Sequence, residues 1–255
     1  MTGLAIDVAA WSSPWRSRSP GDKALLCCGL VGCALVLPTW PAAPAVLVTT
    51  AVLALGPARL SWRVLLRVVR VPAAFIVLAA APVAVTVRTD PGFALLVTRD
   101  GMLRAADLGL HGLAGSAAVL LLAATTPLSD LLPRLRALGV PSAVIEIALL
   151  MYRLLFELLD SIRAITEAQT ARLGYAGWAA ALRSSSGLVA AVLVRSWDRA
   201  RRLETGLAGR GLEGSLTVLD ETAPSDRRFL TASLTGLAAL TALSLLCAGS
   251  DPRWR

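Results

Sequence analysis

Two arginines stand among small residues near the ends of long helical patterns, and their side chains suit contacts between proteins. Arg172 lies in AQTARLGY, residues 168–175, and Arg210 lies in GLAGRGLEG, residues 206–214. A guanidinium group presents a rigid fork of N–H donors that fits a carboxylate. Small neighbours let a helix end approach another protein closely, and a cation there complements the helix dipole. The pattern indicates either a plain arginine cap or a docking point for a partner.

Residue types that perform catalysis or bind metals are sparse in the rest of the chain. The single histidine, His111, lies in DLGLHGLAG with Asp107 four residues before it, whereas a metal site needs several converging ligands. The sequence contains no GxxxxGK[ST], HExxH or GxSxG pattern. The four cysteines lie in apolar runs without a CxxC pair, which is typical of buried apolar side chains. We therefore expect no catalytic residue, no metal site and no cofactor in this chain.

The composition is that of a membrane protein. Hydrophobic residues make up 56% of the 255 residues, charged residues make up 16%, and the mean hydropathy is +0.67. Soluble domains have about 25% charged residues, and the apolar residues here fall in long blocks. Arginines in loops that orient membrane helices explain the net charge of +8, so nucleic acid is not an expected partner. The sequence predicts an all-α polytopic protein of the cell membrane, with about five transmembrane helices and long amphipathic cytoplasmic helices.

The apolar blocks divide the chain into three parts. An N-terminal membrane domain, residues 1–126, is followed by a cytoplasmic or interfacial segment, residues 127–228, and by a last transmembrane helix with a short tail, residues 229–255. The hydrophobic segments of the first part cover about 24–37, 42–55, 72–87 and 108–126. The first two have only about 14 residues, roughly 21 Å of helix, against a hydrocarbon core of ~30 Å. They either cross as short spans or form a hairpin that does not fully cross.

Residues 58–72, before the third segment, predict an amphipathic helix with one basic face. Its arginines recur at spacings of four, four and three, which places them on one side of a helix. They are Arg59, Arg63, Arg67 and Arg70. An arginine-faced helix of this kind lies at a membrane surface and binds lipid headgroups.

Basic residues beside the spans predict the orientation of the chain. The stretches 1–23 and 57–70 carry three and four basic residues, against three in 88–107 and two in the C-terminal tail. Positive charge near a span favours the cytoplasmic side. We therefore expect the N-terminus in the cytoplasm and the C-terminus outside.

Two long amphipathic helices are predicted within residues 127–228. Residues 142–173 and about 187–208 each carry an apolar stripe with a period near 3.6. The first helix is apolar enough to lie at the membrane surface, but its charged residues make a full crossing costly. The serines at 184–186 are expected to lie in the link between the two helices. The helices end near Arg172 and Arg210.

Three connected stretches of this region resemble a known family. They are TTPLSDLLPRLRALGVP, MYRLLFELLDSIRAITEAQTARLGY and VRSWDRARRLETGLAGRGLEG. The chain resembles, over essentially its full length, the T component of energy-coupling factor (ECF) transporters, and it is most similar to the cobalt/nickel-type, CbiQ-like branch. The most specific parts are two Ala-Arg-Gly-like signatures, which in that family end helices that dock into grooves of two ATPase subunits. Carried over, they fall on Ala171, Arg172 and Leu173 and on Gly209, Arg210 and Gly211.

The two signatures depart from the family pattern at one position each. Leu173 stands where glycine is frequent, and a glycine follows one place later at Gly174. Gly209 stands where alanine is usual. Both signatures keep the arginine and a small residue before it.

The resemblance implies a non-enzymatic transmembrane scaffold of an ATP-driven importer. Two cytoplasmic ABC-type ATPase subunits would bind ATP and magnesium, and a small membrane substrate-binding subunit would take the substrate. The apolar face of the helix 142–173, including Met151, Leu155 and Leu159, would contact that subunit. Cobalt or nickel ions are the substrate that this branch implies, and a vitamin is the alternative.

A stand-alone permease or a membrane-anchored enzyme is the alternative from a different class. A permease that carries its own substrate needs polar groups at mid-depth in the membrane. Such groups are nearly absent from the first three apolar segments, which favours the scaffold.

Overall fold

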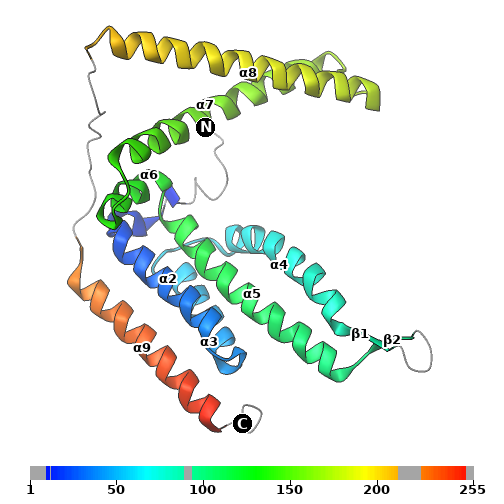
Figure 1. Cartoon of the computed structure of the whole chain (residues 1–255), viewed down its shortest axis with the longest axis vertical. Helices are drawn as coiled ribbons and strands as arrows, with labels where there is room; N and C mark the ends of the chain where they lie inside the picture. The colour runs from blue at the N-terminus through cyan, green and yellow to red at the C-terminus, as the bar shows by residue number, and fades with distance from the viewer. Residues whose placement is uncertain (1–9, 12, 89–93, 212–224, 251–255) are drawn as a thin grey trace. The chain divides into compact units, whose positions relative to one another are not determined.

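The computed structural model describes residues 10–11, 13–88, 94–211 and 225–250. The chain divides into two compact units (Figure 1). The membrane unit consists of Met1–Leu131 and Thr222–Arg255, and the coupling unit consists of Leu132–Glu221. The boundaries therefore fall at 131/132 and 221/222.

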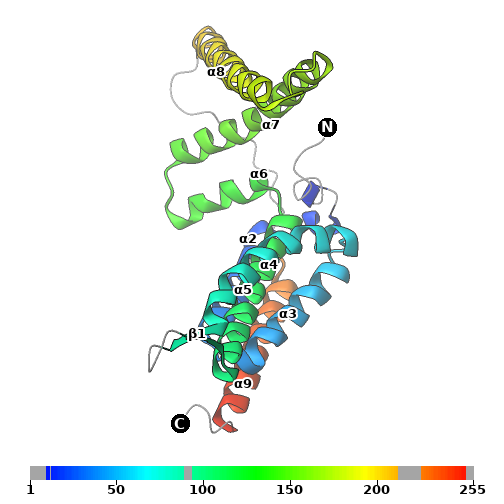
Figure 2. The same cartoon turned by 90° about the vertical axis from the view of Figure 1, so that its right-hand side faces the viewer.

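The membrane unit is a bundle of apolar helices with α5 in the middle. Its elements are the 3-10 helix η1 (Pro14–Ser17), the helices α2 (Pro20–Val36), α3 (Thr39–Leu55), α4 (Trp62–Ala84), α5 (Arg99–Thr125), α6 (Leu128–Leu131) and α9 (Arg227–Ser250), and the strands β1 (Val85–Arg88) and β2 (Ala94–Val97). Helix α5 packs against α2, α3 and α4, and α9 packs against α2 and α3 (Figures 1 and 2). The strands form a short antiparallel hairpin between α4 and α5.

Small side chains allow α5 to take this central place. Its buried stripe consists of Ala114, Ala118, Leu121 and Thr125, at the spacing of one helix face. Small residues bring helix backbones close together, which is how helices associate where lipid weakens the hydrophobic drive. The Thr125 hydroxyl donates to the carbonyl of Leu121 at 2.7 Å, so its polar group is satisfied within the helix.

The predicted fold class, an all-α polytopic membrane protein, is confirmed. Three described helices are long and apolar enough to cross a membrane: α4, α5 and residues Arg227–Cys247 of α9. Much of the surface of α4 is exposed and apolar, including Phe75, Val77 and Leu78, as expected of a helix that faces lipid. Helices α2 and α3 have 17 residues each, so their full crossing stays a prediction.

Two of the predicted segments of this unit have different boundaries. Most of residues 58–72 and of the third apolar segment, 72–87, lie in one helix, α4, which runs through Pro72, whereas residues 85–87 belong to β1. A break in a spanning helix would leave backbone N–H and C=O groups without hydrogen-bond partners, because the lipid interior holds no water. The helix therefore continues through the proline. Arg59 lies before this helix with a φ of 49°, so only Arg63, Arg67 and Arg70 share its face. The fourth segment, predicted at 108–126, begins earlier, because α5 starts at Arg99.

The coupling unit consists mainly of two long helices. Its elements are η2 (Leu132–Leu138), α7 (Ser142–Ala171) and α8 (Trp178–Ala208). Helix α7 begins at residue 142 as predicted and ends two residues before the predicted 173, whereas α8 begins earlier than the predicted residue 187. Ser184, Ser185 and Ser186 therefore lie inside a helix and not in a link. The hydroxyls of Ser184 and Ser186 donate to the carbonyls of Gly174 and Arg183, so both polar groups are satisfied within the coupling unit.

Polar side chains at the start of α2 bind the membrane unit at two places, where the chain leaves for the coupling unit and where it returns. Lys23, which is 1% exposed, donates from Nζ to the carbonyls of Trp15 and Thr125, both at 3.2 Å. The carboxylate of Asp22 accepts from the Ser225 hydroxyl at 2.9 Å and from the backbone N–H of Asp226 at 3.0 Å. These two side chains thus bind the end of α5 and the residues that precede α9.

Two arginines of the preceding segment add ion pairs to the same two places. Arg16 pairs with Asp130 at 3.4 Å, and Arg18 pairs with Asp226. We call Arg16, Arg18, Asp22 and Lys23, together with the groups that they bind, the α2 junction. It fixes the chain just before it leaves the membrane unit and just after it returns.

We expect the substitution Lys23→Met to destabilise the membrane unit. Methionine keeps an apolar stem of similar length but leaves the buried carbonyl of Thr125 without its donor, which costs about 1–3 kcal/mol. At about 2–4 °C per kcal/mol, thermal unfolding in detergent would show a midpoint lowered by several degrees. Arg104→Met, at an exposed arginine of α5, is the control and should leave the midpoint unchanged. Equal midpoints for both variants would contradict a stabilising role for the junction.

Candidate functional site

Helix α7 ends in a hydrogen-bonded reversal that places Arg172 at its tip. The backbone N–H of Gly174 donates to the carbonyl of Gln169 at 2.8 Å, and that of Leu173 donates to Thr170 at 3.0 Å. These two bonds define a Schellman motif, in which the residue after the cap adopts a left-handed conformation. Leu173 takes that conformation with a φ of 57°. Arg172 is the cap residue directly before it.

Side chains around Gly174 hold this first corner, residues 169–175, against the start of α8. Gln169 donates from Nε2 to the carbonyl of Ser184 at 2.9 Å, and it accepts from the Tyr175 hydroxyl at 2.7 Å. A Cβ atom at Gly174 would lie 2.6 Å from Ser184 Oγ and 2.8 Å from the Gln169 carbonyl oxygen. Only glycine therefore fits there, and the close approach fixes the backbone that carries Arg172.

The second corner, residues 205–211, also ends in a left-handed residue after its arginine, but there the cap residue is Gly209. The backbone N–H of Gly209 donates to Thr205 at 3.0 Å, and that of Gly211 donates to Ala208 at 3.1 Å. Gly211 is left-handed, with a φ of 67°, and Arg210 directly precedes it. Both arginines thus stand immediately before a left-handed residue. The third position of each signature is that residue, which is the physical reason why glycine suits it.

The six signature residues are all exposed, namely Ala171, Arg172, Leu173, Gly209, Arg210 and Gly211. Within the described residues, the side chains of Arg172 and Arg210 make no ion pair or hydrogen bond. Helix α8 between them has 31 residues, which at 1.5 Å per residue is about 46 Å. With no partner among the described residues, each guanidinium group can bind a carboxylate, and the two lie at separate places.

The apolar face of α7 lies open along its N-terminal half. Met151 is 66% exposed and Leu155 is 42% exposed, and Val144 and Ile147 extend the same exposed stripe toward the start of the helix. Leu159 is half-buried, and Glu157 of the same helix pairs with Arg199 of α8. Of the three predicted contact residues, the structure exposes Met151 and Leu155 most.

His111 joins two helices of the membrane unit. Its Nδ1 lies 2.9 Å from the Thr39 hydroxyl of α3 and 3.2 Å from the Asp107 carbonyl. Over the described parts of the chain, no three His, Cys, Asp or Glu side chains gather as metal ligands do. The histidine connects α3 to α5 through a hydrogen bond.

Taken together, these features define a multi-pass α-helical membrane protein whose second unit exposes two arginines at helix ends. The family model described as "Cobalt transport protein", CbiQ, matches residues 12–219. The chain is 40% identical over 249 residues to the cobalt transport protein CbiQ of Rhodobacter capsulatus, covering 96% of this chain and 100% of that protein. It belongs to the CbiQ family of cobalt transport proteins, as its resemblance to the CbiQ-like branch predicted.

Two further relatives extend this similarity. The cobalt transport protein CbiQ of Salmonella typhimurium is 29% identical over 219 residues, covering 81% of this chain and 95% of that protein. A putative fused cobalt transport protein, CbiMQ, of Methanocorpusculum labreanum is 27% identical over 229 residues, covering 85% of this chain but 38% of that protein. The relatives are named as transport proteins, so this chain is a membrane component of the transport class.

We expect Leu173→Gly to stabilise the coupling unit. A left-handed conformation costs an L-residue about 1–2 kcal/mol, whereas the extra freedom of glycine in the unfolded chain costs about 0.5–1 kcal/mol. Leu173 is 75% exposed, so its removal loses little packing. The free energy of unfolding, followed by helical circular dichroism, should rise by roughly 0.5–1 kcal/mol. Gly174→Ala, one residue on, should lower it, and a fall with both variants would contradict the left-handed corner.

Proposed function

We propose that this chain is the transmembrane T subunit of an ECF-type importer of cobalt or nickel ions. Two cytoplasmic ABC-type ATPase subunits would bind ATP and magnesium, and a separate small membrane subunit would bind the ion. The observation that carries the proposal is the pair of exposed arginines, each directly before a left-handed residue and without a side-chain partner among the residues that the structure describes. Neither catalysis nor a cofactor is assigned to this chain.

The spacing of the arginines supports two ATPase subunits rather than one. A helix of about 46 Å separates the corners, and an arginine fork engages one carboxylate-bearing groove at a time. The Gln169, Tyr175 and Ser184 hydrogen bonds make the first corner stiff. A displacement of an ATPase would therefore move the helix that carries the arginine instead of bending the corner.

The exposed stripe of α7 is the proposed contact for the substrate-binding subunit. Exposed methionine and leucine at helical spacing provide an adaptable apolar surface for another helix. The fused relative supports a partner that lies close to this subunit, because 62% of that chain (100% minus the 38% matched) lies outside the similarity. In our proposal the N-terminus faces the cytoplasm, where the ATPases lie, and the C-terminus lies outside.

The ion is proposed from the relatives, because this subunit does not itself select the substrate. Three relatives are named as cobalt transport proteins, which favours cobalt or nickel over the alternative, a vitamin. Uptake of radioactive cobalt by cells that express the full set of subunits would separate the two.

We expect Arg172→Ala and Arg210→Ala each to weaken binding of the ATPase subunits encoded with this chain. An arginine at the centre of an interface contributes about 2 kcal/mol or more, which is on the order of 30-fold in affinity. The double change should abolish co-purification in detergent. Arg172→Lys should bind with intermediate affinity, because lysine keeps the charge but not the planar fork.

The matched control is the double change Arg183→Ala and Arg202→Ala. Both are exposed arginines of α8 without a side-chain ion pair among the described residues, so the control removes the same amount of charge from the same unit without changing either corner. It should co-purify with the ATPases as the native chain does. Equal loss in control and test variants would show a general charge effect and refute docking at the corners.

We expect Met151→Ser with Leu155→Ser to release the substrate-binding subunit while leaving the ATPases bound. Exposed apolar side chains contribute through burial of about 25 cal/mol per Å², and serine removes most of that area. Co-purification of all subunits from membranes measures both contacts at once. Retention of the substrate-binding subunit by this variant would place its contact elsewhere on the chain.

A further inference from the structure

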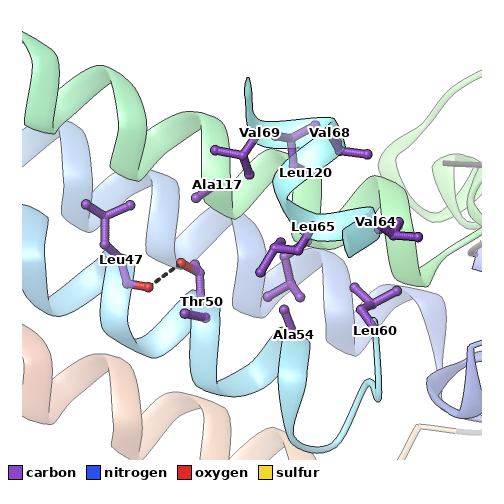
Figure 3. A pocket seen from close by; sticks show the side chains of 13 residues that line it. Leu47, Thr50, Ala54, Leu60, Val64, Leu65, Val68, Val69, Ala117 and Leu120 are labelled. Atoms are coloured by element: carbon purple, nitrogen blue, oxygen red, sulfur yellow. Dashed lines mark hydrogen bonds between the residues drawn. The ribbon is translucent and has the colours of Figure 1, made fainter. Parts of the chain in front are cut away.

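An apolar cavity of about 140 Å³ lies between α3, α4 and α5 (Figure 3). Its wall includes Thr50 and Ala54 of α3, Leu65 and Val69 of α4, and Ala117 and Leu121 of α5. The Thr50 hydroxyl is already satisfied by the Leu47 carbonyl at 2.9 Å. An apolar cavity of about 150 Å³ stays dry and accepts a benzene-sized hydrocarbon. The space therefore suits a short length of hydrocarbon and not water or an ion.

The helix that forms one wall of the cavity also carries a stripe of positive charge. Arg63, Arg67 and Arg70 are exposed on α4. None of their side chains forms an ion pair or a hydrogen bond with the described residues. The sequence contains no aspartate or glutamate between Asp22 and Asp90. No acidic residue near the stripe in the sequence therefore balances its positive charge.

The basic stripe and the cavity wall are neighbours on the helix surface. Arg63 and Arg67 directly precede Val64 and Val68, both of which line the cavity, and successive residues are about 100° apart around a helix. Trp62, 60% exposed, lies beside Arg63, with the guanidinium 5.7 Å from the ring centroid. Exposed tryptophan beside arginine is typical of a helix at the headgroup level of a membrane.

We propose that α3, α4 and α5 bind one anionic phospholipid, with its phosphate at Arg63 and Arg67 and part of an acyl chain in the cavity. A ligand for this place must join a negative charge to a flexible hydrocarbon across the width of one helix face. An anionic lipid has both parts in that order, and it is abundant in the surroundings of a membrane helix. The proposal does not depend on the ATPase partners or on the transported ion.

Occupancy of the cavity would act near the α2 junction. Ala124 lines the cavity, and the next residue, Thr125, offers its carbonyl to Lys23. A bound lipid would fill the gap between α4 and the end of α5, where the chain leaves the membrane unit. It would thereby hold α4 against the bundle.

The test uses the full chain, purified in a neutral detergent, with added phosphatidylglycerol or phosphatidylcholine. Native mass spectrometry measures retained lipid, and thermal unfolding measures its stabilising effect. We expect phosphatidylglycerol to be retained and to raise the unfolding midpoint more than phosphatidylcholine. Each arginine near an anionic headgroup is worth about fivefold in affinity, so Arg63→Gln with Arg67→Gln should lower retention roughly 25-fold.

Two further variants separate the headgroup from the acyl chain. Arg99→Gln with Arg104→Gln removes the same charge from exposed positions on the first turns of α5 and should retain phosphatidylglycerol like the native chain. Ala117→Phe fills the cavity and should lower retention although the arginines remain. If that variant fails to fold, the smaller change Ala117→Leu serves in its place.

Several results would overturn the proposal. One is equal retention of the two lipids, and another is equal loss in the two arginine pairs. Stabilisation by inorganic phosphate alone as large as that by phosphatidylglycerol would assign the stripe to a free anion. Unchanged lipid retention in the Arg63, Arg67 and Ala117 variants, together with loss of a co-purifying membrane subunit, would assign the cavity to a protein partner.

Discussion

The arrangement of the membrane unit depends on the hydrogen bonds that the buried ammonium group of Lys23 donates. A charge that is 1% exposed is tolerated only where polar groups replace its water. Here the carbonyls of Trp15 and Thr125 do so. Asp22, beside it, binds Ser225 and Asp226. Because these partners stand where the chain leaves and re-enters the unit, one short segment of α2 fixes both connections to the coupling unit.

In the coupling unit, a backbone conformation places the two arginines. A left-handed residue ends a helix abruptly, so the residue before it stands at the tip with its side chain free of the helix. Arg172 and Arg210 both occupy that position. The signature is therefore a backbone device that presents an arginine, and its small residues are needed for the turn and for close approach. The geometry of the turn thus explains the residue types of the signature in physical terms.

The sequence predicts the helices well where their hydrophobic periodicity is strong. It predicts them poorly where a contact between residues distant in sequence determines the local structure. The apolar stripe of α7 predicts its bounds, and the two arginines are identifiable from their small neighbours. Two predicted segments meet at Pro72, but the lack of water in a membrane favours one continuous helix through it. Ser184 suggests a link, but its bond to Gly174 keeps it helical. The bond between Lys23 and Thr125 joins residues 102 apart, and no local pattern predicts such a pair.

The two corners differ in a way that bears on how they could act. At the second, glycine occupies the left-handed position without strain, and no atom lies within 4 Å of the Cβ that Gly211 lacks. At the first, Leu173 holds that conformation at a cost of about 1–2 kcal/mol, and the Gln169, Tyr175 and Ser184 bonds offset it. The first arginine is thus carried on a strained, cross-linked corner and the second on a relaxed, open one. The two arginines are therefore presented by corners of different stiffness, although both corners rest on the same left-handed turn.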